Sequence, residues 1–172
     1  MWSPCDSYSL RYFDEDNSTE LWYIDGSGYS YFPRSYNAVW NDYAEYRQTE
    51  TIKYGHVYQE NNNGIMTETN ERLIPGCSIA SDTFGSAMGE TDIAKTPMAV
   101  AGRVLVYTYQ SRENYQAGMA VCSAPNGTID IMTREEIMMY PDCIIGYVSE
   151  VPNYEEWGKE HIKVNNRIWI KI

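Results

Sequence analysis

The sequence predicts a mainly β protein: a small barrel or sandwich-like module with one or two short helices, preceded by an aromatic β-hairpin. Short apolar runs rich in β-branched and aromatic residues recur from Thr51 onward, and glycine-rich turns separate them. Tyrosine is unusually frequent, with 16 copies beside 5 tryptophans and 3 phenylalanines. This composition suits half-buried strands and amphipathic contact surfaces better than an oily core. Only one segment carries clear helix signals.

The first 36 residues are predicted to form a shaft-like or linker lead-in. Residues 1–18 are polar and lack a sustained period, which indicates an irregular or loosely strand-like segment. Aromatic runs at residues 20–24 and 29–32 then flank Asp25-Gly26-Ser27-Gly28, the residue types of a tight hairpin turn. An isolated hairpin is not stable in water, so it must pack on the rest of the chain or between three copies of it.

Residues 37–172 are predicted to form the β-rich C-terminal module. Two segments resemble each other: Gly55-His56-Val57-Tyr58 leads to Asn63-Gly64, and Gly118-Met119-Ala120-Val121 leads to Asn126-Gly127. Asn-Gly favours a type I′ turn, so both read as hairpins, although glycine-rich β proteins also produce such matches by chance. The expected strands lie at residues 52–58, 78–79, 98–109, 119–122, 129–132, 143–148, 162–164 and 167–172.

The helix signals lie at residues 134–139. Thr133 is a suitable N-cap, and Glu135 and Glu136 are well placed in the first turn. Pro141 is expected to end this helix.

Length and charge restrict the function. A chain of 172 residues suits one domain with an accessory segment. The net charge of −11 disfavours nucleic acid and anionic membrane surfaces, which would repel the protein. Met1-Trp2-Ser3-Pro4 lacks the basic start of a signal peptide, and no apolar run is long enough to span a bilayer.

The sequence predicts no metal, cofactor or nucleotide site. Its four cysteines, Cys5, Cys77, Cys122 and Cys143, form no CxxC pair and read as buried reduced thiols. With two histidines, His56 and His161, the usual triads are difficult to assemble, and a Cys77–His56 pair has little support from spacing.

Two acidic residues are the candidates for chemistry. Asp42 and Glu45 would share one face of a helical turn, where each could raise the pKa of the other. A carboxylic acid beside a carboxylate can act as acid and base in amide cleavage. Alternatively, Asp42 caps a turn and Glu45 pairs with Arg47 or Lys53.

The segment Asn41-Asp42-Tyr43-Ala44-Glu45-Tyr46 resembles the start of peptidase G2, the intramolecular-chaperone autoproteolytic cleavage domain at the C-terminal end of phage tail spikes and neck appendages. The resemblance covers about residues 36–172, and looser matches follow the motif. These are Thr83-Phe84-Gly85, Lys95-Thr96-Pro97, Ala101-Gly102-Arg103-Val104, Ala117-Gly118-Met119-Ala120-Val121 and Ile144-Ile145-Gly146-Tyr147-Val148.

The resemblance implies a module that promotes trimer assembly and in many members then cuts itself free. By position, Asp42 would be the catalytic acid or base, Glu45 its neighbour, and the cut would fall near Ala38–Val39. Cleaving members usually have serine at the position of Val39, and valine has no hydroxyl with which to attack. This departure weakens the protease expectation more than the fold expectation.

Three functions follow as hypotheses. The first is a tail-fibre or appendage module of the virion, made in the cytoplasm of the bacterial host. This module would act as an intramolecular chaperone or terminal knob. Its partners would be copies of itself, as a trimer, and other tail proteins. The second is a self-cleaving peptidase using Asp42 and Glu45. The third is a knob that binds a host surface glycan through exposed aromatic rings and acceptors such as Asp142 and Glu155.

Overall fold

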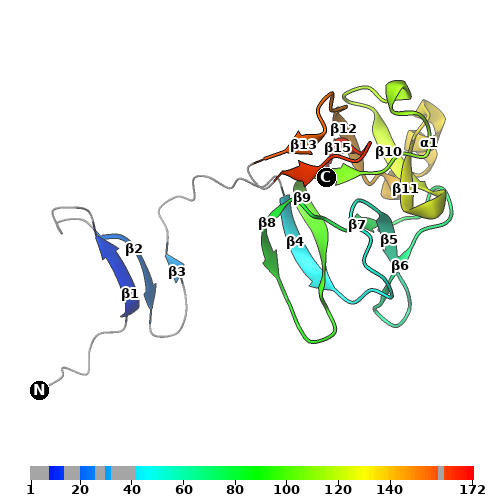
Figure 1. Ribbon diagram of the computed structural model, residues 1–172. Coiled ribbons are helices and arrows are strands. Elements are labelled where there is room, and N and C mark those ends of the chain that lie inside the picture. Colours follow the sequence, from blue (N-terminus) through cyan, green and yellow to red (C-terminus); the bar gives the residue numbers. More distant parts are fainter. Residues whose placement is uncertain (1–7, 14–19, 26–29, 32–41, 159–160) are drawn as a thin grey trace, which may run out of the picture. The chain divides into compact units, whose positions relative to one another are not determined.

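The computed structural model describes residues 8–13, 20–25, 30–31, 42–158 and 161–172 (Figure 1). These residues fall into two compact units, one within residues 1–38 and the other within residues 39–172.

The N-terminal unit is a small antiparallel sheet in the order β1-β2-β3. The predicted hairpin corresponds to the pairing of β2 with β3, in which Tyr23 lies opposite Tyr31. Its predicted turn lies outside the described residues. Strand β1 lies in the predicted lead-in, where the sequence pattern was too irregular to delimit a strand. The bounds are β1 Tyr8–Phe13, β2 Glu20–Asp25 and β3 Ser30–Tyr31.

The C-terminal unit is built on a seven-stranded sheet in the order β11-β10-β12-β15-β9-β4-β8. Its pairings are antiparallel except that of β4 with β8, which is parallel. The bounds are β4 Asp42–Arg47, β8 Phe84–Met88, β9 Thr96–Val106, β10 Ala120–Ala124, β11 Thr128–Ile131, β12 Gly146–Glu150 and β15 Ile168–Lys171.

Smaller elements cover this sheet. A three-stranded sheet has the order β6-β5-β7, and β13 pairs with β14. The bounds are β5 Val57–Glu60, β6 Met66–Glu68, β7 Ser78–Ile79, β13 Glu156–Trp157 and β14 Ile162–Lys163, with α1 at Arg134–Met139 and 3-10 segments at Arg112–Asn114, Pro125–Gly127 and Pro141–Cys143.

The main core lies between the large sheet and the small one. Val57 of β5 and Ile79 of β7 pack with alternate residues of the large sheet, among them Val104, Ile168 and Ile170. The fold is therefore mainly β, as predicted, and sandwich-like; the described strands do not close into a barrel.

The opposite face of the large sheet is also covered at its centre. Leu105 of β9 and Trp169 of β15 pack against Trp157 and Ile162 of the β13–β14 hairpin. The rings of Trp157 and Trp169 meet edge to face, 5.1 Å apart. Because both faces are buried here, β9 and β15 contain continuous apolar runs instead of alternating ones.

The predicted helix is confirmed as α1, which begins after Thr133 and ends before Pro141. The Thr133 hydroxyl accepts the Glu136 backbone N–H at 3.2 Å, and the Glu136 carboxylate accepts the Thr133 backbone N–H at 2.8 Å. This reciprocal capping box satisfies two donors that the start of a helix leaves without partners.

Both predicted hairpins are present, as β5–β6 and β10–β11. In the second, Asn126 and Gly127 both have positive φ, as a type I′ turn requires. In the first, Gly64 has positive φ but Asn63 does not, so the two turns differ.

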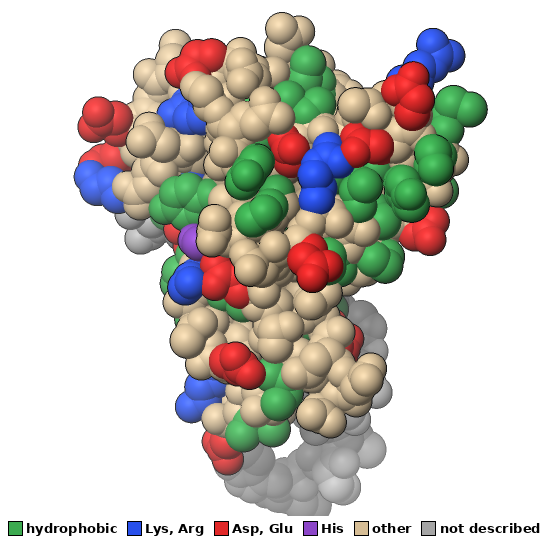
Figure 2. All heavy atoms as spheres, turned by 90° about the vertical axis from the view of Figure 1, so that its right-hand side faces the viewer, with side chains coloured by type: hydrophobic (Ala, Val, Ile, Leu, Met, Phe, Trp, Pro, Cys, Tyr) green, Lys and Arg blue, Asp and Glu red, His purple; other side chains and the backbone are tan. Residues whose placement is uncertain are grey.

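Apolar side chains also reach the surface. Figure 2, which looks at the side of the molecule that carries α1, shows them among acidic and basic groups. Met138, Met139 and Tyr140 at the end of α1, together with Tyr147 of β12, are exposed. Within the described ranges, no helix has the length and apolar character that crossing a bilayer requires.

Candidate functional site

Asp42 is the first residue of β4 and points into the protein. Side chains along β4 alternate, so Asp42 and Ala44 are buried while Tyr43 and Glu45 are exposed. The expected helical turn is therefore wrong. Residues three apart on a strand lie on opposite faces, so Asp42 and Glu45 do not form a carboxylate pair. Strand β4 forms because β9 and β8 supply hydrogen-bonding partners on both of its edges.

Two hydroxyl groups hold the Asp42 carboxylate. Ser81 donates to Asp42 Oδ1 at 3.1 Å and Thr83 donates to the same oxygen at 2.8 Å. All three side chains are buried. Among the described residues, the second oxygen, Oδ2, has no hydrogen-bond partner although it is shielded from solvent.

Burial raises the pKa of the Asp42 carboxyl to about 6, even though the hydrogen bonds from Thr83 and Ser81 oppose the shift. The negative charge of Asp82 adds a smaller increase. A carboxyl of raised pKa was predicted from the sequence, and Asp42 is one. The cause differs, however, because loss of water replaces the neighbouring Glu45 as the source of the shift.

Glu45 makes the surface contact that the alternative interpretation expected. Its carboxylate lies 3.6 Å from the Arg47 guanidinium and its side chain is about half exposed, at 53%. Arg47 also pairs with Glu60. An exposed pair of this kind contributes little to stability.

Asp82, which lies between Ser81 and Thr83, connects their segment to Arg167 near the C-terminal end of the chain. Arg167 is buried, and its guanidinium donates to both oxygens of Asp82, at 2.8 and 2.9 Å. Arg167 also donates to the carbonyls of Val164 and Lys163. The bidentate pair sets the position of the tripeptide 81–83, which places two hydroxyls beside Asp42.

This arrangement was not predicted from the sequence. Thr83 was identified only through the resemblance, and Ser81, Asp82 and Arg167 not at all. The signal in the sequence is a polar triplet directly after the apolar residues Ile79 and Ala80, but its partners lie about 40 residues before it and 85 residues after it.

The other candidates lie elsewhere. The expected cleavage position, Ala38–Val39, is outside the described residues. His56 contacts Glu68 at 2.6 Å and packs edge-on against Tyr107, whereas the Cys77 thiol donates to the Ile74 carbonyl. The structure does not bring His56 and Cys77 together as a catalytic pair.

The three described cysteines are free; Cys122 and Cys143 are buried as predicted, Cys77 is only partly buried, and Cys5 lies outside the described residues. Burial raises the pKa of the Cys77 thiol to about 12, so the reactive thiolate is scarce at neutral pH. In the portion of the chain that the structure describes, no cluster of His, Cys, Asp and Glu could hold a metal ion.

The chemistry available at this site is proton transfer. A carboxyl with a pKa of about 6 changes its charge near neutral pH and can act as acid or base. The two hydroxyls beside it could relay a proton or attack a carbonyl. A structural role is equally consistent with these contacts, because the same network ties β4 to the segment between β7 and β8.

Comparison with known proteins gives one informative result. No family model matches the chain, and no curated protein matches it. Among solved structures, the fold is shared with a phage protein, the pre-mature bacteriophage phi29 gene product 12. The TM-score is 0.57 over 88% of this chain, with 12% sequence identity, and the chain spans 24% of that protein's length. A likeness at this identity establishes the fold.

Proposed function

We propose that this chain is a module of a bacteriophage tail appendage, located in the virion, which associates with copies of itself and promotes assembly as an intramolecular chaperone or terminal knob. The observation that carries the proposal is the shared fold with phi29 gene product 12 over 88% of this chain. The chain corresponds to 24% of that longer protein, as a module of a larger appendage would.

The exposed side of β4, β8 and β9 is the surface that best fits association between copies. Tyr43, Met88 and Val100 are 63%, 67% and 59% exposed. β4 joins the strands on which the other two residues lie, and β8 is an edge strand. Apolar side chains on a sheet face beside an edge strand favour contact with another protein surface.

The test is the mass of the protein in solution. Analytical ultracentrifugation at micromolar concentration is expected to give a trimer, and Tyr43→Asp is expected to shift it toward monomer. The control is Tyr147→Asp, which replaces another exposed strand tyrosine on β12 and should leave the trimer intact. A strictly monomeric wild type at high concentration would contradict the proposal.

Self-cleavage is a second candidate function. The observation in its favour is the buried Asp42 carboxyl with its raised pKa and the two hydroxyls beside it. Asp42 would be the acid or base, and the cut would fall near Ala38–Val39. Glu45 is the weaker member of the expected pair because it points away from Asp42 on the opposite face of β4.

Mass spectrometry of four proteins separates these roles: wild type, Asp42→Asn, Val39→Ser, and the double variant. If only the missing hydroxyl prevents cleavage, Val39→Ser releases a fragment beginning at or near residue 39 and the double variant stays intact. Cleavage of the wild type that Asp42→Asn abolishes would make the chain a peptidase as it stands. Intact wild-type and Val39→Ser proteins with folded spectra would reject self-cleavage.

A further inference from the structure

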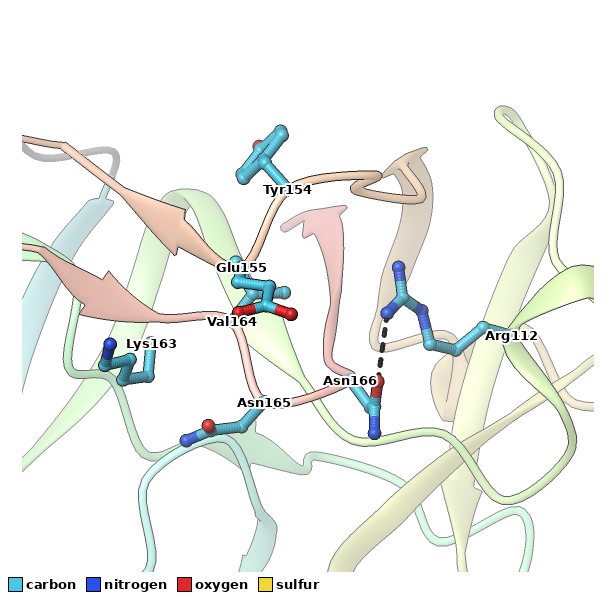
Figure 3. Close-up of a pocket in the computed structure, with 7 residues that line it drawn as sticks. All are labelled: Arg112, Tyr154, Glu155, Lys163, Val164, Asn165 and Asn166. Atoms are coloured by element: carbon cyan, nitrogen blue, oxygen red, sulfur yellow. Dashed lines mark hydrogen bonds between the residues drawn. The ribbon is translucent and has the colours of Figure 1, made fainter.

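Two adjoining hollows lie beside the turn between β14 and β15. The first has a volume of about 240 Å³ and the second about 380 Å³. Both are lined by Arg112 and Asn166, whose side chains are joined by a 3.4 Å hydrogen bond (Figure 3). The hollows therefore form one groove, divided by the Arg112–Asn166 contact and separate from the Asp42 site.

Local backbone contacts form this groove without a ligand. Asn165 and Asn166 both have positive φ, at 51° and 61°, which asparagine tolerates better than most residues. Val164 donates its backbone N–H to the Glu155 carbonyl, and Arg112 donates to the Pro152 carbonyl. The groove is consequently preorganised, and binding would need little ordering of the protein.

The walls of the groove carry hydroxyls, amides and charges of both signs. Arg112 and Lys163 are balanced by Glu155 and Glu113. Lys163 is already paired with Glu156, outside the groove lining. A small anion would therefore meet no unpaired cluster of positive charge, and the net charge of −11 opposes anions further.

Hydrogen-bonding capacity nevertheless remains. Arg112 makes two side-chain hydrogen bonds, one to Asn166 and one to Pro152, out of the five N–H donors of a guanidinium. Within the described part of the chain, its Nε has no acceptor but is shielded from solvent, so the donors left for a ligand are the remaining N–H groups of its two terminal nitrogens. The Glu155 side chain is exposed and lines the first hollow. Tyr154 supplies an aromatic ring, held in place because its hydroxyl accepts the Trp169 indole N–H at 2.8 Å.

We propose that this groove binds a neutral saccharide of one or two rings. Ligand pockets typically have volumes of about 300–1,000 Å³, and the two hollows together fall within that range. Vicinal hydroxyls can donate to Glu155 while accepting from Arg112 and Asn166, which suits a polyhydroxylated ligand. Of the two acceptors singled out from the sequence, Glu155 lines the groove and Asp142 does not.

The test is NMR of the full chain: saturation transfer to a panel of neutral hexoses, N-acetylhexosamines and their disaccharides, and ¹⁵N–¹H amide titrations that also include inorganic phosphate as the anionic probe. Binding of at least one sugar is expected, with amide shift changes at Asn165 and Asn166. Glu155→Gln and Asn166→Gly should each weaken it about tenfold, since each removes one hydrogen-bonding group. Glycine tolerates the positive φ of Asn166, so that variant is expected to fold.

Glu135→Gln is the matched control, because it neutralises an exposed acid on α1 and should leave binding unchanged. No saturation transfer from any sugar, or tighter binding of phosphate than of every sugar, would overturn the proposal. Equal binding by wild type and both groove variants would also overturn it. None of these outcomes bears on oligomer formation, so this proposal and the assembly proposal fail separately.

Discussion

At Asp42, burial in the fold opposes the negative charge of the carboxylate. A buried carboxylate loses its hydration, and here two neutral hydroxyls replace only part of it. The protein therefore holds an ionisable group whose charged form is disfavoured in the folded state. Such groups are concentrated at functional sites, although structural networks also contain them.

The raised pKa predicts an unusual pH dependence of stability. Asp42 has a pKa of about 6 in the folded protein and about 3.9 when unfolded, so the folded state binds its proton more tightly. This contribution to stability is complete below about pH 4 and declines as pH rises to about 6. Urea unfolding at several pH values should show Asp42→Asn gaining stability relative to wild type over this interval, by roughly 1–3 kcal/mol.

Glu45→Gln is the control for this experiment, because it removes a carboxylate from the exposed face of β4 and leaves the buried Asp42 site intact. Thr83→Val should steepen the slope or move it to higher pH, since it removes a hydrogen bond that lowers the pKa of Asp42. An identical pH dependence in wild type and Asp42→Asn would contradict the buried, titrating carboxyl.

The close approach of Gly55 to Arg167 gives a second prediction about a single residue. It has a φ of +77°, and an added Cβ would lie 2.5 Å from Arg167 Cδ, so Gly55→Ala should displace the side chain that binds Asp82. Gly76, with a φ of +66° and nothing within 4 Å of its Cβ position, is the matched control. Chemical denaturation should give about 1–2 kcal/mol of destabilisation for Gly76→Ala and about 1–3 kcal/mol more for Gly55→Ala. Equal losses of unfolding free energy in the two variants would mean that the Arg167 side chain moves aside without destabilising the protein.

At the scale of elements, the sequence was informative where the signals were local. The capped helix α1, the two Asn-Gly hairpins and strand β7 were predicted because their residues act on neighbours a few positions away. β4 was misread because its motif, Asp42 to Tyr46, has both helical spacing and strand alternation. Pairing with β9 and β8 makes this segment a strand, and those partners lie about 40 to 60 residues away in the sequence.

The capping box of α1 makes a prediction for that element. Thr133→Ala removes the oxygen that accepts the Glu136 N–H and should cost about 1 kcal/mol of unfolding free energy, whereas Thr133→Ser retains an acceptor and should cost much less. Glu136 is additionally bound by Arg72, which should keep the helix folded in both variants. Urea unfolding measures the cost, and indistinguishable alanine and serine variants would rule out the capping contribution.

At the scale of the whole molecule, the described apolar core lies within residues 44–170. A chain restricted to residues 39–172 should therefore fold by itself, with the urea midpoint of the full chain within error. Circular dichroism and urea titration provide the measurement. A truncated chain without cooperative unfolding would indicate that residues 1–38 contribute to the stability of the C-terminal unit.

The candidate sites were less predictable than the fold. Asp42 was identified through a motif resemblance, but its partners Ser81 and Thr83 follow from the parallel pairing of β4 with β8, which local patterns do not encode. Glu155 was identified as an acceptor from the sequence. Arg112 and Asn166 line the same groove because the fold brings together loops that are distant in the sequence. Single residues of each site were thus accessible from the sequence, and their combination was not.

The position of β4 between β9 and β8 also has a mechanical consequence. The chain enters the C-terminal unit at Asp42, and β4 is hydrogen-bonded to β9 on one side and β8 on the other. Tension applied along the chain from the N-terminal side would load both ladders in shear, so that many bonds resist together instead of opening one after another. A peripheral strand would peel away under the same force. The module is therefore joined to whatever precedes it by a strand suited to bearing load.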